Sequence, residues 1–443
     1  MRLLATATLI AALIALAGPP ALAAPPPTLV VDDDRAQCAQ ADFGSIQAAV
    51  DEAPSGGLVR VCPGRYEEHV TIDKALTLKG QPNAVEAIDC FDPTPSHLGD
   101  ADPTLHAILD GTTTPAPVLF DIDADDVRVE GFVLQGENGG TVSAAIDAGA
   151  AHSGYVIRHN LIRLNSVGIQ LGSNGTSPSR FEHNCLRQNG WGLATDSREL
   201  VNARIDHNRT YRTANNAFEP ANFLTRNLRL DHNHSRQDNF AYRILGNSAE
   251  TQLVANTIES SRLGIVVGGG LPHVRLEIAD NLIFVDPALA VPAVPAGGQQ
   301  QGIAFVSPPP SVPPTLGAVV HGNAITGMRD GIVAAGPPMG ATAALVDSQL
   351  TSNLTSDNLR DGIVLRGLNS GNTVRSNLAE RNGRYGIYAQ GAIGNLFDAN
   401  QMTANGVFDA RDENRPANTW TANSCVTDFP DGTICNPQTP IAP

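Results

Sequence analysis

The chain has 443 residues and is acidic, with 45 Asp and Glu against 29 Lys and Arg and a formal net charge of −16. This balance argues against nucleic acid or an anionic lipid surface as a general partner, because both are polyanions. A chain of this length would ordinarily divide into domains, since single hydrophobic cores stop growing at about 250 to 300 residues. The repeats described below remove that limit, because a solenoid grows by adding coils.

Residues 1–23 have the pattern of a secretory signal. Arg2 precedes an apolar run that is too short to span a membrane, and Ala21-Leu22-Ala23 offers a small-residue cleavage site. No later apolar run reaches the about 18 residues that a spanning helix needs. We therefore expect cleavage near Ala23 and a single secreted domain over residues 24–443. It should be extracellular or periplasmic, monomeric and without a membrane span.

Six cysteines in an exported chain favour disulfides over metal-binding or catalytic thiols. Two preferred pairs would each fix one end of the chain, and the third pair remains by elimination. The pairs are Cys38 with Cys62, Cys425 with Cys435, and Cys90 with Cys185.

The first predicted elements form an N-terminal cap over about residues 28–80. In the stretch ADFGSIQAAVDEAP, Phe43, Ile46, Ala49 and Val50 recur at helical spacing. The strand-like stretch GLVRVCPG follows directly. Because a solenoid needs its end covered, this segment predicts a capping helix.

Asparagine then recurs in one sequence context through most of the chain. Successive intervals are 24, 24, 25, 23, 25, 42, 30, 24 and 23 residues. Eight or nine residues after most of these asparagines comes a small residue followed by an apolar one, for example Gly168-Ile169. The positions are Asn160, Asn184, Asn208, Asn233, Asn256, Asn281, Asn323, Asn353, Asn377 and Asn400. A period of about 20 to 50 residues is typical of a solenoid or a propeller.

The content of the repeat selects between those architectures. Short alternating apolar stretches, such as YVIRHNLI and VGIQL, are separated by Asn and Gly and show no helical period. In a parallel β-helix each strand pairs with its equivalent one coil away, so identical residues stack about 4.8 Å apart. A buried Asn at a corner can then satisfy backbone groups that the turn leaves unpaired. The sequence therefore predicts an all-β, parallel β-helix with an N-terminal capping helix.

The two long intervals coincide with stretches rich in Pro, Gly and Ala. VDPALAVPAVPAGGQQQ follows Asn281, and AAGPPMGATAA follows Ile332. Both indicate loops inserted at corners while the coil continues. The repeat fades after about residue 406. Residues 406–443, which hold Trp420 and the last cysteine pair, are predicted to close the other end.

The segment FGSIQAAVDEAPSGGLVRVCPGRYEEHVTIDKALTLKGQ and the N-x-I…G-I repeats after it resemble right-handed parallel β-helix proteins of the pectin-lyase-like superfamily. The resemblance covers roughly residues 28–425 and implies the fold. It implies no single activity, because that superfamily includes lyases, hydrolases, esterases, epimerases, adhesins and periplasmic copper-delivery accessories.

The motifs of individual enzyme families are incomplete in this chain. The stretch 64–68, GRYEE, is similar to the G-x-Y-x-E motif of pectin methylesterases, but without their later carboxylate motifs it indicates a structural role. Asp125-Asp126 resembles the adjacent carboxylates of polygalacturonases, whose Gly-His-Gly and Arg-Ile-Lys motifs are missing. Ile205-Asp206-His207 and Leu230-Asp231-His232 look like the Ile-Asp-His segment of pectate lyases, whose R-x-P-x-x-R motif is absent. A calcium-assisted lyase stays open, with calcium as a candidate cofactor.

Histidines precede four ladder asparagines on consecutive coils and should form a column of their own. Carboxylates stand directly before three of them, and arginines follow the histidines within four or five residues, with tyrosines nearby. This combination predicts a site for a uronate chain, because arginine pairs with carboxylates in bidentate geometry and sugar residues repeat at about 5 Å, close to the strand spacing. For β-elimination, arginine or a metal would neutralise the uronate carboxylate, and His or Tyr would take the C5 proton.

The residues of this predicted site fall into three groups. The column holds His159, His183, His207 and His232. The predicted catalytic residues are Asp206, His207, Tyr211, Asp231, His232 and Arg236. The predicted substrate-binding residues are Arg163, Arg187, Arg212 and Tyr242.

Three functions stay open from the sequence. The preferred one is a secreted protein that binds an acidic, uronate-containing polysaccharide and, if it is an enzyme, cleaves it as a polysaccharide lyase or glycoside hydrolase. The second is a non-catalytic surface or adhesion protein, because the histidine position holds Ala, Asp, Gly or Ser in other coils. The third is a periplasmic copper or metal accessory. We assign no metal ligands, since side chains in parallel columns diverge and do not converge on one ion.

Overall fold

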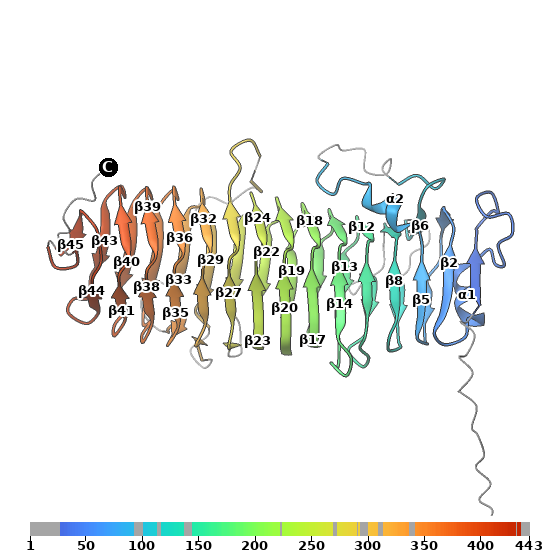
Figure 1. Ribbon diagram of the computed structural model, residues 1–443, viewed down its shortest axis with the longest axis horizontal. Coiled ribbons are helices and arrows are strands. Elements are labelled where there is room, and N and C mark those ends of the chain that lie inside the picture. Colours follow the sequence, from blue (N-terminus) through green and yellow to red (C-terminus); the bar gives the residue numbers. More distant parts are fainter. Residues whose placement is uncertain are drawn as a thin grey trace, which may run out of the picture.

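Three sheets of parallel strands run along the molecule (Figure 1). The computed structural model describes residues 27–92, 101–112, 117–136, 144–221, 224–268, 273–289, 291–292, 300–308, 313–335, 342–430 and 432–435. Each coil passes through sheet A, sheet B and sheet C in turn, as β11 (Val156–Arg158), β12 (Leu161–Arg163) and β13 (Val167–Gln170) do. The described residues form a parallel β-helix, which confirms the predicted fold class.

Each strand pairs in parallel with its equivalent on the neighbouring coil, for example β11 with β14 and β14 with β17. Sheet A contains β1 (Thr28–Val31), β2 (Gly57–Val61), β5 (Leu76–Lys79), β8 (Arg128–Glu130), β11, β14 (Ser179–Glu182), β17 (Glu199–Asp206), β20 (Leu224–Asp231), β23 (Asn247–Val254), β26 (His273–Val274), β27 (Glu277–Ala279), β30 (Thr315–Leu316), β31 (Val319–His321), β34 (Leu345–Val346), β35 (Gln349–Thr351), β38 (Thr373–Arg375), β41 (Leu396–Asp398) and β44 (Thr419–Thr421).

Sheet B contains β3 (Gly64–Tyr66), β6 (Ala107–Asp110), β9 (Phe132–Gln135), β12, β15 (Cys185–Arg187), β18 (Arg209–Tyr211), β21 (His234–Arg236), β24 (Thr257–Glu259), β28 (Leu282–Phe284), β32 (Ala324–Thr326), β36 (Leu354–Ser356), β39 (Leu378–Glu380) and β42 (Gln401–Thr403). Sheet C contains β4 (Val70–Ile72), β7 (Val118–Ile122), β10 (Ala144–Ala148), β13, β16 (Trp191–Ala194), β19 (Asn216–Ala221), β22 (Phe240–Ile244), β25 (Leu263–Val267), β29 (Gln301–Val306), β33 (Asp330–Ala335), β37 (Asp361–Arg366), β40 (Tyr385–Gln390), β43 (Phe408–Asp412) and β45 (Asp428–Phe429).

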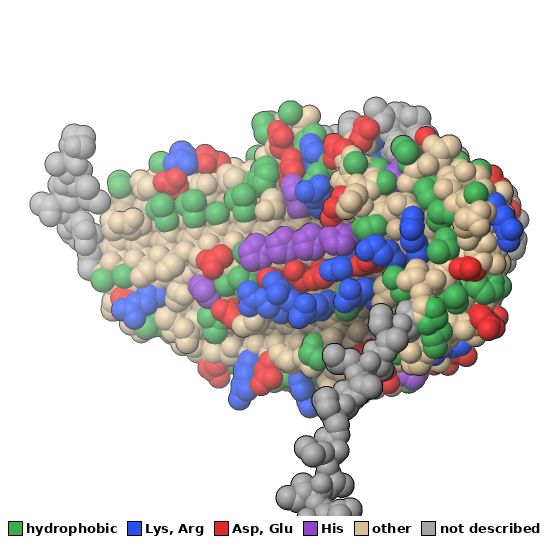
Figure 2. All heavy atoms as spheres, turned by 45° about the vertical axis from the view of Figure 1, so that its right-hand side comes forward, with side chains coloured by type: hydrophobic (Ala, Val, Ile, Leu, Met, Phe, Trp, Pro, Cys, Tyr) green, Lys and Arg blue, Asp and Glu red, His purple; other side chains and the backbone are tan. Residues whose placement is uncertain are grey.

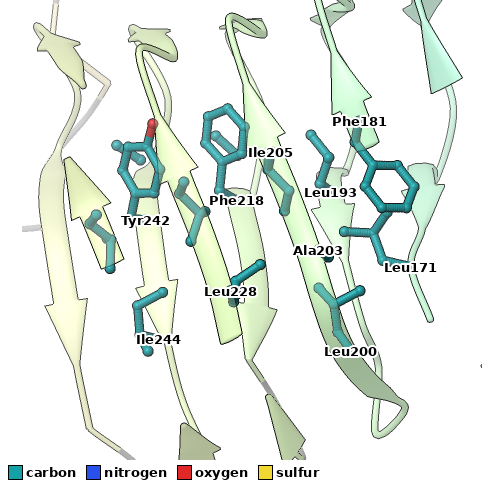
Figure 3. Close-up of a cluster of buried hydrophobic side chains, with 14 of the residues drawn as sticks. Leu171, Phe181, Leu193, Leu200, Ala203, Ile205, Phe218, Leu228, Tyr242 and Ile244 are labelled. Carbon is teal, nitrogen blue, oxygen red and sulfur yellow. The ribbon is translucent and has the colours of Figure 1, made fainter. Parts of the chain in front are cut away.

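Apolar columns facing inward from all three sheets fill the interior. Strand alternation turns every second side chain inside, so Phe181 and Ile205 of sheet A stack one coil apart. Figure 3 shows Leu193, Phe218 and Tyr242 continuing this packing on sheet C. The rings of Phe218 and Tyr242 are stacked with their centroids 4.7 Å apart. Burial of apolar surface, at roughly 25 cal/mol per Å2, therefore stabilises every coil against its neighbours.

The predicted asparagine ladder is confirmed, and it follows the corner between sheets A and B. The backbone N–H and the Nδ2 of Asn184 both donate to Asn208 Oδ1 at 3.0 Å, and Nδ2 also donates to the carbonyl of Ile157 at 2.9 Å. Each asparagine thus joins its own coil to the coils before and after it. The ladder crosses the first long interval, where Asn281 donates to Asn323 Oδ1 at 3.0 and 2.9 Å. The coil therefore continues past that insertion, as predicted.

The helix α1 (Ile46–Glu52) covers the first coil with its apolar face buried, as predicted. The carboxylate of Glu68 accepts hydrogen bonds from the backbone N–H groups of Ile46 at 2.7 Å and Gln47 at 3.0 Å, which stabilises the helix N-terminus. Tyr66 of the same G-x-Y-x-E motif is buried and donates to a backbone carbonyl at 3.0 Å. These contacts support the structural role predicted for this motif.

The C-terminal end differs from the prediction, because the coil does not stop at residue 406. Strands β43, β44 and β45 pair with β40, β41 and β43. Asn400 donates to Asn423 Oδ1 at 3.0 and 2.9 Å, so the ladder also continues. Trp420 belongs to this last coil and stacks on Phe397 with centroids 4.0 Å apart. Strands of two to five residues among Asp, Arg and Pro gave too weak an alternation to be recognised in the sequence.

All three predicted disulfides are present. Their Cα atoms lie 6.3, 5.6 and 5.2 Å apart in Cys38–Cys62, Cys90–Cys185 and Cys425–Cys435. Within the described ranges, no helix is long and apolar enough to cross a membrane. The predicted signal, residues 1–23, lies outside those ranges, and its cleavage stays a prediction.

Candidate functional site

The four histidines stack in a column on the outside of the coil. We refer to His159, His183, His207 and His232 as the histidine column. Successive ring centroids lie 5.1, 4.9 and 5.1 Å apart. The last three rings are almost parallel, with interplanar angles of 1° and 4°. Figure 2 shows the column as a continuous row on the surface. The sequence prediction of a histidine column beside the asparagine ladder is confirmed.

The backbone explains why these histidines share one position. Each directly precedes a ladder asparagine, and each has a φ between +54° and +56°. Asn, Asp and His enter this left-handed region more readily than most other residues with a side chain. Ala255 and Ser352 occupy the equivalent corner of other coils with the same φ of +54°. The corner therefore needs a residue that tolerates positive φ, and histidine is one of several that do.

Two charged columns lie beside the histidines on sheet A. Residues two apart in a strand share a face, so each of the three coils with β14, β17 and β20 presents an arginine, a carboxylate and a histidine in order toward the corner. The register aligns the arginine column, Arg180, Arg204 and Arg229, and next to it the carboxylate column, Glu182, Asp206 and Asp231.

The carboxylates are the covered members of this arrangement. Only 1% of the Asp231 side chain is exposed, whereas Arg204 and His232 are 47% and 52% exposed. In Figure 2 the acidic atoms form a row between the histidine row and the basic row. The outermost polar groups of this surface are therefore guanidinium and imidazole groups, although the whole chain is acidic.

Asp231 joins the arginine and histidine columns. Arg204 donates to its two carboxylate oxygens at 3.0 and 2.8 Å, and His232 Nδ1 lies 3.0 Å from its Oδ2. Burial by itself would raise the pKa of Asp231, but the hydrogen bonds from Arg204 and His232 outweigh burial and lower it. The carboxylate therefore stays charged and favours the imidazole tautomer that carries its proton on Nδ1. His207 repeats the pair one coil earlier, with its Nδ1 2.9 Å from Asp206 Oδ2.

In each pair this tautomer leaves the lone pair on Nε2, the atom that can accept a proton or a hydrogen bond. Burial, and then the neighbouring imidazoles of His159 and His207, lower the pKa of His183. At neutral pH His183 is therefore a neutral hydrogen-bonding group.

A cleft of about 290 Å3 borders the first part of the histidine column. Its outer wall is the segment of α2 (Pro82–Glu86) and the residues up to Cys90. Its floor is made by corner residues of three consecutive coils, among them His159, His183 and His207.

The wall is held in place by apolar packing and by a disulfide. Val85 packs on the outside of sheet B against Leu161, and the bond from Cys90 to Cys185 ties the segment to β15. Glu86 Oε1 lies 2.5 Å from His159 Nδ1, and the His159 side chain is only 20% exposed.

Of the six predicted catalytic residues, the structure brings together four: Asp206, His207, Asp231 and His232. The other two, Tyr211 and Arg236, lie on sheet B beyond the asparagine ladder. Tyr211 is 2% exposed and its ring centroid is 6.0 Å from that of Phe91, while the Arg236 guanidinium packs over the same ring. Both are therefore separated from the histidine column by the corner of the coil.

The predicted substrate-binding arginines also lie on sheet B. Arg163 and Arg187 are fully buried. Arg163 donates to Gln135 Oε1 at 3.0 and 2.7 Å, and Arg187 donates to the carbonyl of Asp89 at 3.2 Å. Buried guanidinium groups cannot contact a polymer on the surface, so the binding role predicted for both is corrected to a structural one. Arg212 is exposed but lies at the far end of β18, with its guanidinium over the ring of Tyr211.

The role predicted for Tyr242 is corrected as well. Its ring is fully buried in the core (Figure 3), and its hydroxyl donates to Asn256 Oδ1 at 3.0 Å. The physical reason is strand alternation, because the second residue of the small-apolar pair faces the interior on every coil.

The arginine column is the feature that sequence reasoning missed. Its signal is a tripled motif, R-x-[DE]-H-N, which occurs as RFEHN from Arg180, RIDHN from Arg204 and RLDHN from Arg229. Period-two alternation would have placed the arginine and the carboxylate of each motif on one face. The prediction instead chose arginines that follow the ladder asparagine, which belong to the next sheet.

Metal ligation finds little support in the described part of the chain. Two groups of side chains there lie close enough to share an ion, Asp32-Asp33-Asp34 and Asp32 with Cys38 and Cys62, and both are in the N-terminal cap. The second group consists partly of a disulfide. In the histidine column, parallel rings about 5 Å apart direct their lone pairs side by side, whereas zinc needs nitrogens converging at about 2.0 to 2.1 Å.

Comparison with protein families gives one match, to the periplasmic copper-binding protein (NosD) family, over residues 315–433. That part comprises the C-terminal coils and does not include the histidine column. Among proteins of curated function, no sequence match is found.

Several solved structures are similar in fold. The A-module of the mannuronan C-5 epimerase AlgE6 of Azotobacter vinelandii is 14% identical, with a TM-score of 0.42 over 87% of this chain and 94% of that chain. The catalytic unit of an α-1,3-glucanase from Streptomyces thermodiastaticus is 15% identical, with a TM-score of 0.48 over 90% and 70%. A mannuronic acid specific family 6 polysaccharide lyase from human gut microbiota is 12% identical, with a TM-score of 0.43 over 85% and 86%. Such identities show the fold alone, which the strand register already establishes as a parallel β-helix.

Proposed function

We propose that the histidine and arginine columns together bind an acidic, uronate-containing polysaccharide that lies along the coil axis. One observation carries this proposal. Exposed rows of imidazole and guanidinium groups flank a row of covered carboxylates, and the pattern repeats on three successive coils (Figure 2).

The repeat distance suits a saccharide chain. The histidine rings recur at 4.9 to 5.1 Å. Sugar residues in an extended chain recur at about 5 Å, close to the strand spacing. Successive sugars would therefore meet equivalent protein groups, so that each coil adds a similar contribution.

The charges on this surface suit a carboxylate-bearing sugar. Arg180 is exposed and makes no ion pair within the described residues. Arg204 and Arg229 pair with Asp231, and their side chains stay 47% and 41% exposed. Guanidinium groups bind carboxylates through two parallel hydrogen bonds. The imidazoles can exchange hydrogen bonds with sugar hydroxyls.

Cleavage would use the same groups. In a β-elimination, Nε2 of His207 or His232 would accept the C5 proton, and an arginine would stabilise the charge that develops on the uronate carboxylate. The bond from C4 to the glycosidic oxygen would break, and that oxygen would take up a proton from the protonated imidazole or from water. The products would be an unsaturated sugar at one new end and a hydroxyl at the other.

The test pairs binding with product analysis. Affinity for pectic, alginate and glycosaminoglycan polymers would be measured by calorimetry, with and without calcium. The variant Arg180→Ala should lose about tenfold in affinity, whereas Arg226→Ala, an exposed arginine outside the arginine column on β20, should bind as the parent does. Mass spectrometry of the products would identify a lyase by unsaturated ends and a hydrolase by hydrated ends. Equal affinity of the two variants for every polymer, or no binding at all, would contradict the proposal and favour a surface protein in which the columns are structural.

A metal accessory role is the second candidate, because the NosD family matches residues 315–433. That segment contains a single histidine, His321, whose Nε2 lies 3.1 Å from Glu277. Copper titration of the parent protein and of His207→Ala would decide between the candidates. Tight binding that His207→Ala abolishes would favour the metal role, and no binding would remove it.

A further inference from the structure

We infer that this surface binds the end of a polysaccharide chain and accommodates about four sugar residues, one for each ring of the histidine column. The inference rests on the proposed function. It comes from the difference between the two ends of the column, one of which is closed by the protein's own backbone.

The closed end lies one coil before His159. Gly131 occupies the equivalent corner there, because Glu130 aligns with Arg158 in the register. The chain leaves the coil directly over it, and Gln81 N donates to the Gly131 carbonyl at 2.7 Å. A Cβ built on Gly131, whose φ is +81°, would lie 2.5 Å from Pro82 N and 2.6 Å from Pro82 Cδ. Neither a side chain nor a sugar ring fits at that position.

The wall of the cleft continues beside the first rings, which form the floor of the cleft. Glu86 contacts His159, and the segment from Val85 to Cys90 borders the column as far as His207. Exposure of the imidazole side chains rises accordingly, from 20% at His159 to 46% at His207 and 52% at His232.

The other end is open. The corner positions after His232 carry small or short side chains, Ala255, Asp280 and Gly322. Figure 2 shows the histidine row continuing on this side onto a smooth surface of the described residues. A chain entering from that side meets imidazoles and arginines, and its first sugar stops at His159 and Glu86.

Oligomer length provides the first measurement. Dissociation constants would be determined for oligogalacturonates and oligomannuronates of two to eight residues. Affinity should rise with each residue up to about four and then level off, because the coils beyond His232 lack the histidine and arginine columns. A steady rise up to eight residues would overturn the inference.

A matched pair of variants extends the test. Ala255→His adds a fifth ring at the open end, in a corner whose φ of +54° histidine already adopts on four coils. The variant should bind the five-residue oligomer two- to fivefold more tightly and the three-residue oligomer unchanged. Ser352→His places the same ring at an equivalent corner far from the column, and it should leave all affinities unchanged.

A third experiment tests whether the amount of bound protein follows the number of polymer ends or the mass of polymer. One polymer preparation would be divided, and half would be partly hydrolysed to raise the number of ends at constant mass. Bound protein per gram should increase with the number of ends. If bound protein follows mass alone, the surface binds chain interiors, and the inference fails while the proposed function stands. If no uronate of any length binds, both fail.

Discussion

The coils from residue 159 to 233 and those from 352 to 423 have the same corner but different surfaces. Asn184 donates twice to Asn208 Oδ1, and Asn353 donates in the same way to Asn377 Oδ1 at 2.9 and 3.0 Å. The residue before the asparagine has a φ near +54° in both regions. That residue is His in the first region and Ser or Ala in the second.

This comparison separates the residues that build the coil from the residues that form the proposed binding surface. The asparagine ladder is shared, so it accounts for the coil, while the outward residues change freely between regions. Histidine, arginine and covered carboxylate columns coincide only in the first region among the described coils. The chemistry of this protein is therefore a property of outer side chains placed on a uniform scaffold.

The largest expected effect concerns the shared ladder. Asn208→Ala would leave the Phe181 carbonyl and the backbone N–H of Asn184 buried and unpaired, which should cost about 4 kcal/mol of unfolding free energy. Asn377→Ala should cost a similar amount, because it makes equivalent bonds. Urea unfolding followed by circular dichroism would measure both. A loss of unfolding free energy below about 1 kcal/mol at either site would contradict the statement that the asparagine ladder stabilises both regions equally.

A buried histidine between the two regions should make the stability of the protein depend on pH. His273 lies inside the coil, where burial lowers its pKa to about 4, and its Nδ1 is 2.6 Å from Ser248 Oγ. Below pH 6.5 the unfolded chain gains a proton there that the folded chain does not take up until about pH 4. This contribution is therefore present above pH 6.5 and is lost as the pH falls to 4, by about 3 kcal/mol.

Unfolding free energies at pH 7.5 and pH 4.5 would measure this effect. His273→Gln should lose about 3 kcal/mol less on acidification than the parent. Parallel profiles of the parent and His273→Gln would show that His273 does not titrate differently in the folded state.

Changes at the corner residues should weaken ligand binding about tenfold in the first region and leave it unchanged in the second. The double variant His207→Ala, His232→Ala removes two rings of the histidine column and should weaken uronate binding by about 1.4 kcal/mol. The matched double variant Ser352→Ala, Ser376→Ala changes the same corners in the second region and should bind as the parent does. Calorimetric titration with one uronate oligomer would compare them, and equal losses would place binding elsewhere.

The smallest expected effect is on stability when the corner residues are exchanged. Ser352→His should change the unfolding free energy by less than about 0.5 kcal/mol, because the position is on the surface and histidine tolerates positive φ. Thermal unfolding would check this. A larger loss would mean that the corner discriminates among side chains and that the two regions are not built alike.

The sequence by itself determined the scaffold. Asparagine spacing, strand alternation and the helical spacing ahead of the first coil were enough for the β-helix, its ladder, its N-terminal cap and the histidine column. These features are local or strictly periodic, so one repeat unit contains the information for its neighbours. The two terminal disulfides followed from pairing the cysteines at each end of the chain, whereas Cys90 with Cys185 remained only by elimination.

Only the tertiary structure decided which polar residues share a surface. Arg187 and Tyr211 are close to the histidines in sequence, yet the turn at the ladder asparagine puts them on sheet B under the segment that follows α2. That segment comes from about a hundred residues earlier, and a disulfide with a sequence separation of 95 holds it there. Contacts of such long range leave no periodic trace in the chain, which is why the closed end of the histidine column is visible only in the folded molecule.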